Sequence, residues 1–106
     1  MSYVNLDDLT EKEVVKGFKG KFVHSKNITI AHWSIDSGSL LPLHKHIHEQ
    51  VVNLIKGKLE FTMNGETKII EPGTNVIIPS NIEHSGKALT DCYIIDVFYP
   101  VREDYK

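Results

Sequence analysis

The amino-acid sequence predicts an all-β fold. Short runs rich in β-branched and aromatic residues recur along the chain, and their spacing of about eight to twelve residues is typical of a sandwich or barrel. Glycine, proline and asparagine separate the runs, and helical periodicity is absent beyond the N-terminal segment. At 106 residues, 41% of them hydrophobic, the chain suffices for one domain with its own core.

The expected elements follow the chain in order. Residues 1–20 are expected to form an N-terminal arm, in which residues 6–16 can hold one short helix capped by Asp7, Asp8 or Thr10. The barrel then takes up residues 21–104. Its expected strands are 21–24, 28–35, 40–46, 50–55, 59–63, 68–70, 75–78, 83–88 and 92–99.

Three turns are expected between these strands. Asn64-Gly65 is the strongest hairpin signal, because a type I′ turn requires positive φ at both central residues. Gly57-Lys58 and Pro72-Gly73 mark two further turns.

Composition excludes several classes of partner. A formal net charge of −2, a pI near 6.3 and no lysine or arginine cluster argue against nucleic acid and against a membrane surface. The first 13 residues are acidic and lack the apolar stretch of a signal peptide, so we expect a cytoplasmic protein. The single cysteine, Cys92, precedes an apolar run and is interpreted as a buried small hydrophobic residue.

Four polar residues predict a metal site. His44 and His46 are two residues apart, so on a strand both imidazoles leave the same face and can converge on one ion. Gln50 follows four residues later, and His84 lies far downstream beyond two prolines. Neutral imidazole is the commonest protein ligand for divalent transition metals.

The spacing of these residues resembles two motifs of the cupin family. The first motif is matched in order by Gly38, His44, His46, Gln50 and Gly57, with glutamine where the family has glutamate. The second is matched by Pro72-Gly73, Pro79 and His84, but here Asn81 replaces a glycine and Ala88 replaces an asparagine. The resemblance covers about residues 36–104 and implies a small double-stranded β-helix, the jelly-roll barrel of cupins.

The resemblance also implies one divalent transition metal inside the barrel mouth, held by His44, His46, Gln50 and His84. The sequence leaves open whether the ion is manganese, iron, cobalt, nickel, copper or zinc. A glutamine ligand leaves the full +2 charge of the ion, which favours a small anionic substrate. The alternative is a metal-free barrel whose histidines are hydrogen-bonded polar groups.

Four other polar residues lie near the motifs or on expected strands. His48 continues the alternation of His44 and His46, and we interpret it as lying behind the ligands or in solvent. Glu49 competes with Gln50, but the three-residue gap after His46 selects Gln50. His24 and His32 are interpreted as ordinary strand residues.

The last expected strand carries a second group of polar residues. Asp96 and Phe98 share one face of that strand, and an aspartate within an apolar run needs a partner or a purpose. One interpretation is an ion pair between Asp96 and Arg102 that ties down the C-terminus.

A sharper interpretation comes from a narrower resemblance. Residues 44–50 and 96–105 resemble the single-domain cupins of pectin and alginate breakdown, which linearise 4,5-unsaturated monouronates. That resemblance implies a site lined by Asp96, Phe98 and Arg102. Arg102 would bind a carboxylate, Asp96 would transfer protons, and the metal would polarise a substrate oxygen.

We therefore expect a metal-dependent isomerase or tautomerase that opens and ketonises a small acidic sugar such as a 4,5-unsaturated uronate. A metal-dependent dioxygenase and a non-catalytic small-ligand-binding cupin remain alternatives, whereas a nucleotide-sugar epimerase is disfavoured because the chain is short. The edge strands of a small jelly roll are commonly covered, so we also expect a homodimer with the N-terminal segment reaching across.

Overall fold

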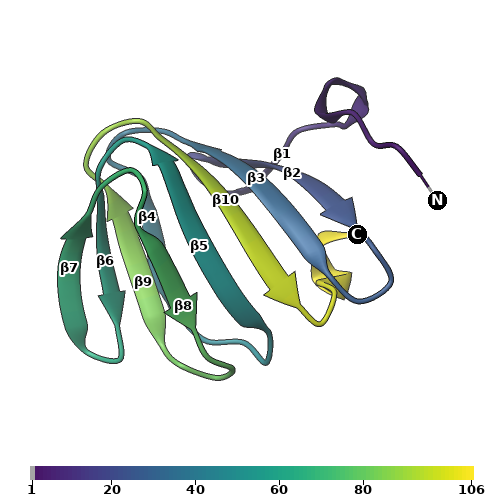
Figure 1. Cartoon of the computed structure of the whole chain (residues 1–106). Helices are drawn as coiled ribbons and strands as arrows, with labels where there is room; N and C mark the ends of the chain where they lie inside the picture. The colour runs from purple at the N-terminus through teal and green to yellow at the C-terminus, as the bar shows by residue number, and fades with distance from the viewer. Residues whose placement is uncertain (1) are drawn as a thin grey trace.

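The computed structural model describes residues 2–106 and confirms the all-β prediction (Figure 1). The described chain forms ten strands. Two 3-10 turns, η1 (Leu6–Asp8) and η2 (Glu103–Tyr105), lie near its two ends. The strands are β1 (Lys12–Val15), β2 (Phe18–His24), β3 (Thr29–Ile35), β4 (Leu40–His44), β5 (Glu49–Lys56), β6 (Leu59–Met63), β7 (Glu66–Ile70), β8 (Asn75–Ile78), β9 (His84–Ala88) and β10 (Cys92–Tyr99).

Two antiparallel sheets enclose one core. The larger sheet has six strands in the order β1-β2-β3-β10-β5-β8, and the smaller has four in the order β4-β9-β6-β7. In the larger sheet, β10 lies between β3 and β5, so the last strand of the chain runs through its middle (Figure 1). Apolar side chains from the inner faces of both sheets fill the space between them, among them Trp33, Leu54, Phe61, Ile78 and Ile94.

The expected N-terminal helix is wrong. Only one 3-10 turn forms there, with the Asn5 side chain accepting from the Asp7 amide at 2.9 Å. Residues 12–24 instead form β1 and β2 of the larger sheet. Gly17, with φ of +83°, allows the tight turn that pairs Val15 with Phe18, so the apolar residues expected on a helix face lie on a strand.

The Asn64-Gly65 turn is confirmed, since both residues have positive φ, at 49° and 82°. The strand expected over residues 40–46 ends early, at His44. Beyond it the chain leaves the sheet, and the carbonyl of His46 accepts from the Asn81 amide at 2.8 Å. Among residues 2–106, no helix is long and apolar enough to cross a membrane.

Candidate metal centre

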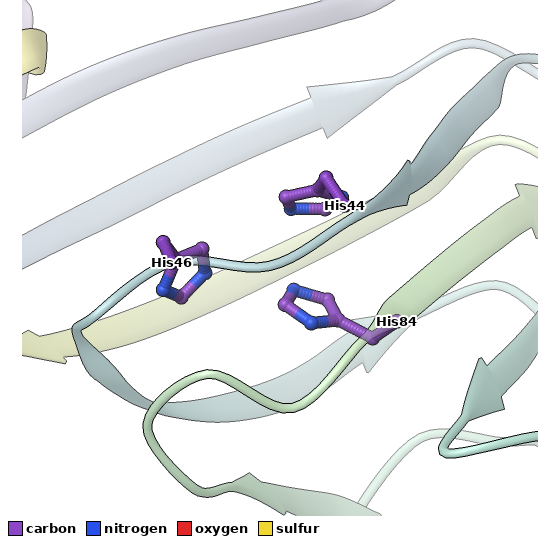
Figure 2. A group of neighbouring side chains, drawn as sticks. All are labelled: His44, His46 and His84. Atoms are coloured by element: carbon purple, nitrogen blue, oxygen red, sulfur yellow. The ribbon is translucent and has the colours of Figure 1, made fainter.

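Three histidines, two at the ends of neighbouring strands and one just beyond a strand, face one point. His44 ends β4 and His84 begins β9, and the two residues are direct cross-strand partners. His46 lies just beyond β4, where the chain curves back toward β5, and its ring faces the other two (Figure 2). Each histidine offers one ring nitrogen such that all three atoms lie within 4.8 Å of one another.

The backbone fixes the tautomer of each ring. A carbonyl oxygen can only accept a hydrogen bond, so the nitrogen that contacts it carries the proton. The Nε2 atoms are therefore left with lone pairs, as metal-binding histidines require. In each ring it is Nδ1 that donates to a backbone carbonyl: His44 to Pro42 (2.8 Å), His46 to His48 (3.0 Å) and His84 to Ile82 (2.9 Å).

Gln50 completes the group from β5. Its side chain is buried, and Oε1 lies 3.1 Å from Nε2 of His46. In this amide orientation Oε1 of Gln50 is an acceptor, and Nε2 of His46 is also an acceptor because the ring proton is on Nδ1. Neither atom can therefore donate a hydrogen bond to the other. Two ligands bound cis to an octahedral ion at about 2.1 Å would lie roughly 3 Å apart, so the observed spacing is one at which both atoms could bind the same cation.

Two further observations fit a divalent transition metal. Nε2 of His84 is buried and has no hydrogen-bond partner, although a buried polar atom normally has one. Burial, reinforced by the positive charge of Arg102, lowers the pKa of His46 to about 4, and burial also lowers that of His84. Both rings are thus neutral at pH 7 and keep the lone pairs that bind metal.

The other polar residues of this segment lie outside the group formed by the three histidines and Gln50. Glu49 points to solvent at the start of β5, whereas Gln50 points inward. His48 supplies the carbonyl that orients His46, and its own ring lies 5.4 Å from that of His46 between centroids. His24 and His32 contact Thr29 and Tyr93, respectively, on the larger sheet.

Asp96 is buried inside the barrel on β10, with 7% of its surface exposed. Its Oδ2 accepts from the indole N–H of Trp33 at 3.0 Å, whereas Oδ1 has no partner in hydrogen-bonding geometry. Burial raises the pKa of Asp96 to about 7, against the opposing effects of Gln50, Trp33 and Arg102. The carboxyl can therefore both hold and release a proton near neutral pH.

The expected ion pair between Asp96 and Arg102 does not form. The chain turns after Pro100 into η2, and this turn brings Asp104 rather than Asp96 against the guanidinium. Nε and Nη2 of Arg102 donate to the two oxygens of Asp104, at 3.0 and 2.7 Å. Although burial acts to lower the pKa of Arg102, this carboxylate raises it overall.

Aromatic rings hold the Arg102 guanidinium from two directions. Its central carbon lies 4.7 Å from the centroid of Phe98 and 4.1 Å from that of Tyr105. Its backbone amide also donates to Thr29 at 2.8 Å. The cation is therefore kept rigid beside the cavity by cation–π contacts.

Sequence comparison identifies the family. The cupin domain model matches residues 31–98, which is most of the chain. The chain belongs to the cupin family. Its similarity to the pectin degradation protein KdgF of Dickeya dadantii is 29% identity over 104 residues, covering 94% of each chain.

Solved cupin structures share the fold over the whole chain. KdgF from Halomonas sp. has a TM-score of 0.92 and 26% identity, covering 100% of this chain and 99% of that one. An RmlC-like cupin from Shewanella frigidimarina has a TM-score of 0.93 at 21% identity, covering 100% and 96% of the two chains. These matches confirm the jelly-roll architecture predicted from the motifs.

One cavity of about 300 Å³ joins the residues predicted from the sequence. The three histidines, Gln50, Asp96, Phe98 and Arg102 all line it, and apolar side chains cover most of the rest. The cupin barrel thus brings three histidines that could hold a metal ion, a carboxyl with a raised pKa and a fixed cation to one space.

Sequence reasoning did not assign other residues that line this cavity, among them Val15, Trp33, Asp104 and Tyr105. Trp33 had a usable signal, because its position within a predicted strand places it on the inward face. Val15 was assigned to a helix, and the role of Asp104 depends on a turn that no local pattern marks.

Proposed function

We propose that this cupin is a metal-dependent isomerase that opens and ketonises a small acidic sugar, most concretely a 4,5-unsaturated uronate. The observation that carries the proposal is the joint presence, in one cavity, of three histidines with free Nε2 atoms, a carboxyl with a pKa of about 7 and a buried arginine. The similarity to KdgF, a pectin degradation protein, supports an acidic sugar as the substrate class.

The proposed roles follow from the position of each group. Arg102 binds the substrate carboxylate through the N–H groups that Asp104 leaves free, and Phe98 packs against the same guanidinium. His44, His46, Gln50 and His84 hold the metal. A divalent ion held there would supply Lewis-acid polarisation of a substrate oxygen.

Asp96 moves the proton. Opening the hemiacetal ring removes a proton from the anomeric hydroxyl and breaks the bond between the anomeric carbon and the ring oxygen, which leaves an enolate. Return of a proton to the former ring oxygen gives the enol. Ketonisation moves the enol proton away and places one on the neighbouring ring-derived carbon. The proton count of the substrate does not change, so one carboxyl with a pKa near 7 can serve in both directions.

Product analysis tests the proposal. The protein, loaded in turn with nickel, zinc, manganese, iron and cobalt, is incubated with an unsaturated monouronate under nitrogen, and the product is identified by NMR. The expected product is the open-chain keto acid of unchanged mass. A product that forms only in air and contains added oxygen would favour the dioxygenase alternative, and a ligand recovered unchanged with every metal would favour a binding cupin.

A further inference from the structure

The indole of Trp33 holds one oxygen of the Asp96 carboxyl. Trp33 lies on β3 and Asp96 on β10, 63 residues apart in the sequence, and Nε1 of the indole donates to Oδ2 at 3.0 Å. A tryptophan nitrogen can only donate, so the direction of this hydrogen bond is fixed. Gln50 lies close to the same carboxyl, but Oδ1 has no partner in hydrogen-bonding geometry. The indole therefore makes the one hydrogen bond that the described side chains complete with this carboxyl.

The strand register brings the indole to Asp96. Asp96 lies directly opposite Ala31, and Trp33 lies opposite Ile94, one inward-facing position further along the strands. Trp33 thus approaches Asp96 along the diagonal, a separation that aromatic side chains can span. Ala31 is fully buried and small, so its side chain leaves room for the indole.

A glycine on the neighbouring strand also makes room for the indole. Gly20 of β2 lies opposite Trp33, and a Cβ atom there would lie 2.8 Å from Cζ3 and 2.9 Å from Cε3 of the indole. Glycine inside a strand weakens it and often marks a site where another group approaches closely. Gly20 is not among the glycines with positive φ, so the need for space, and not the backbone conformation, accounts for it.

Three aromatic rings fix the plane of the indole. Phe18, Phe22 and Tyr105 meet it nearly edge to face, at interplanar angles of 79°, 80° and 82°. A phenylalanine could make similar packing contacts, so the N–H group is what tryptophan adds at this position. That group points at the carboxyl of Asp96 from a rigid support.

We propose that Trp33 is a positioning residue, whose N–H group fixes the orientation of the Asp96 carboxyl for proton transfer. This role rests on the isomerase function proposed above. The torsion that turns a carboxyl group has broad minima, so without the hydrogen bond the orientation of Asp96 would be poorly defined. After the carboxyl has given its proton to the substrate, the same N–H group stabilises the negative charge that remains on the carboxylate.

The alternative is a structural role, in which Asp96 is present only to accept the hydrogen bond of a buried indole. A backbone carbonyl or a neutral side chain would accept that bond without the cost of burying a carboxyl group. Both residues also line the cavity that contains the three histidines. The position of the pair within the cavity therefore favours a role in the reaction.

Replacement of the indole N–H by sulfur tests this role at nearly constant shape. Trp33 is the single tryptophan of the chain, so growth of a tryptophan auxotroph on L-3-benzothienylalanine changes this position alone. The sulfur analogue keeps the bicyclic ring but cannot donate a hydrogen bond. We expect kcat on an unsaturated monouronate to fall by about tenfold to a hundredfold with KM little changed, because misplacing a reacting group by about 1 Å costs up to that much.

Two controls separate positioning from packing. Protein that contains 5-fluorotryptophan, which keeps the N–H group, should have kcat and KM close to those of the wild type. In the Asp96→Asn background, the sulfur analogue should change the residual kcat by about twofold or less, because the group that Trp33 positions is no longer there. Thermal unfolding of each protein distinguishes loss of folded enzyme from loss of turnover.

The outcomes distinguish this role from the function on which it rests. A sulfur analogue with wild-type kcat, or one that lowers kcat equally with Asp96 and with Asn at that position, would overturn the role of Trp33 and leave the isomerase standing. A wild type that converts no monouronate with any metal would remove the isomerase and this role together.

Discussion

The carboxylate of Asp104 occupies two donors of the Arg102 guanidinium, with Nε and Nη2 at 3.0 and 2.7 Å from its oxygens. The side chain of Arg102 is nearly buried, whereas that of Asp104 is mostly exposed. A substrate carboxylate must therefore use the remaining N–H groups or displace Asp104. Asp104 would therefore compete with the carboxylate of the proposed substrate for the guanidinium of Arg102.

Asp104→Asn is expected to tighten the binding of acidic sugars, because it removes the competing negative charge and keeps a hydrogen-bond acceptor. We expect KM to fall by about twofold to fivefold, as for loss of one partly exposed ionic contact, with kcat little changed. Steady-state kinetics on an unsaturated monouronate measures both. Glu103→Gln, an equal charge change at the neighbouring exposed residue, is the control, and equal effects in the two variants would contradict a specific role for Asp104.

Arg102→Ala is expected to raise KM far more than it lowers kcat, because a carboxylate contact acts in the ground and transition states alike. Arg102→Lys keeps the charge but loses the planar fork and should give an intermediate KM. Thermal unfolding of each variant separates binding from stability. If turnover per folded molecule is normal in both, Arg102 is only a structural residue.

Asp96→Asn is expected to lower kcat by on the order of 10²–10⁴ with little change in substrate binding, because an amide cannot take up the proton. Calorimetric binding of the substrate to the variant measures the second half of this statement. Full activity of the folded variant would remove Asp96 from the mechanism.

Asp96→Asn, which is expected to lower activity, is also expected to raise stability above neutral pH. The pKa of Asp96 is about 7 in the folded protein but about 3.8 in an ordinary carboxyl, so between these values the unfolded state releases its proton first. This group therefore reduces stability progressively as the pH rises from about 4 to 7. The melting temperature of metal-free Asp96→Asn, relative to wild type, should be higher at pH 8 than at pH 4. An equal difference at both pH values would contradict the raised pKa.

Gln50→Glu is expected to retain the metal but to weaken the binding of carboxylates. At an effective dielectric constant near 20 and a separation of about 5 Å, the added negative charge costs roughly 3 kcal/mol before screening. Titration calorimetry with a uronate measures the loss. Glu49→Gln changes a charge at the neighbouring exposed residue and should leave the affinity unchanged. Undiminished affinity in Gln50→Glu would contradict the electrostatic role of the neutral amide.

Much of the fold was predictable because local patterns specify it. The strands at residues 59–63, 75–78 and 92–99 were predicted at their observed bounds, since alternation and flanking turn residues mark them clearly. The N-terminal strand was missed because Val14 and Val15 give too short a pattern to distinguish a strand from a helix face. Its pairing with β2 depends on the turn at Gly17.

The candidate site divides in the same way. The three histidines and Gln50 occupy fixed positions in the two cupin motifs. The motifs therefore identified residues that the fold brings together. The contact of Trp33 with Asp96 depends on how β3 pairs with β10, across 63 residues of sequence. Arg102 pairs with Asp104 instead of Asp96 because of the turn that follows Pro100. Neither relationship has a local signature.

His84→Ala is expected to abolish metal binding, because it removes the ligand whose buried Nε2 has no other partner. Elemental analysis of the wild type should give about one divalent ion per chain after reloading, and His84→Ala should give none. His32→Ala, at a histidine bonded to Tyr93 on the larger sheet, is the matched control and should retain the ion. No stoichiometric ion in the wild type with any metal would leave a metal-free barrel.

The most direct test is the ultraviolet absorbance of a 4,5-unsaturated monouronate after mixing with the protein. Metal-loaded wild type is expected to abolish the absorbance of the conjugated double bond catalytically. Chelated wild type and folded His84→Ala are expected to leave it decaying at the uncatalysed rate. An absorbance that decays at that same rate with the loaded wild type, whichever metal is supplied, would contradict the proposed isomerase.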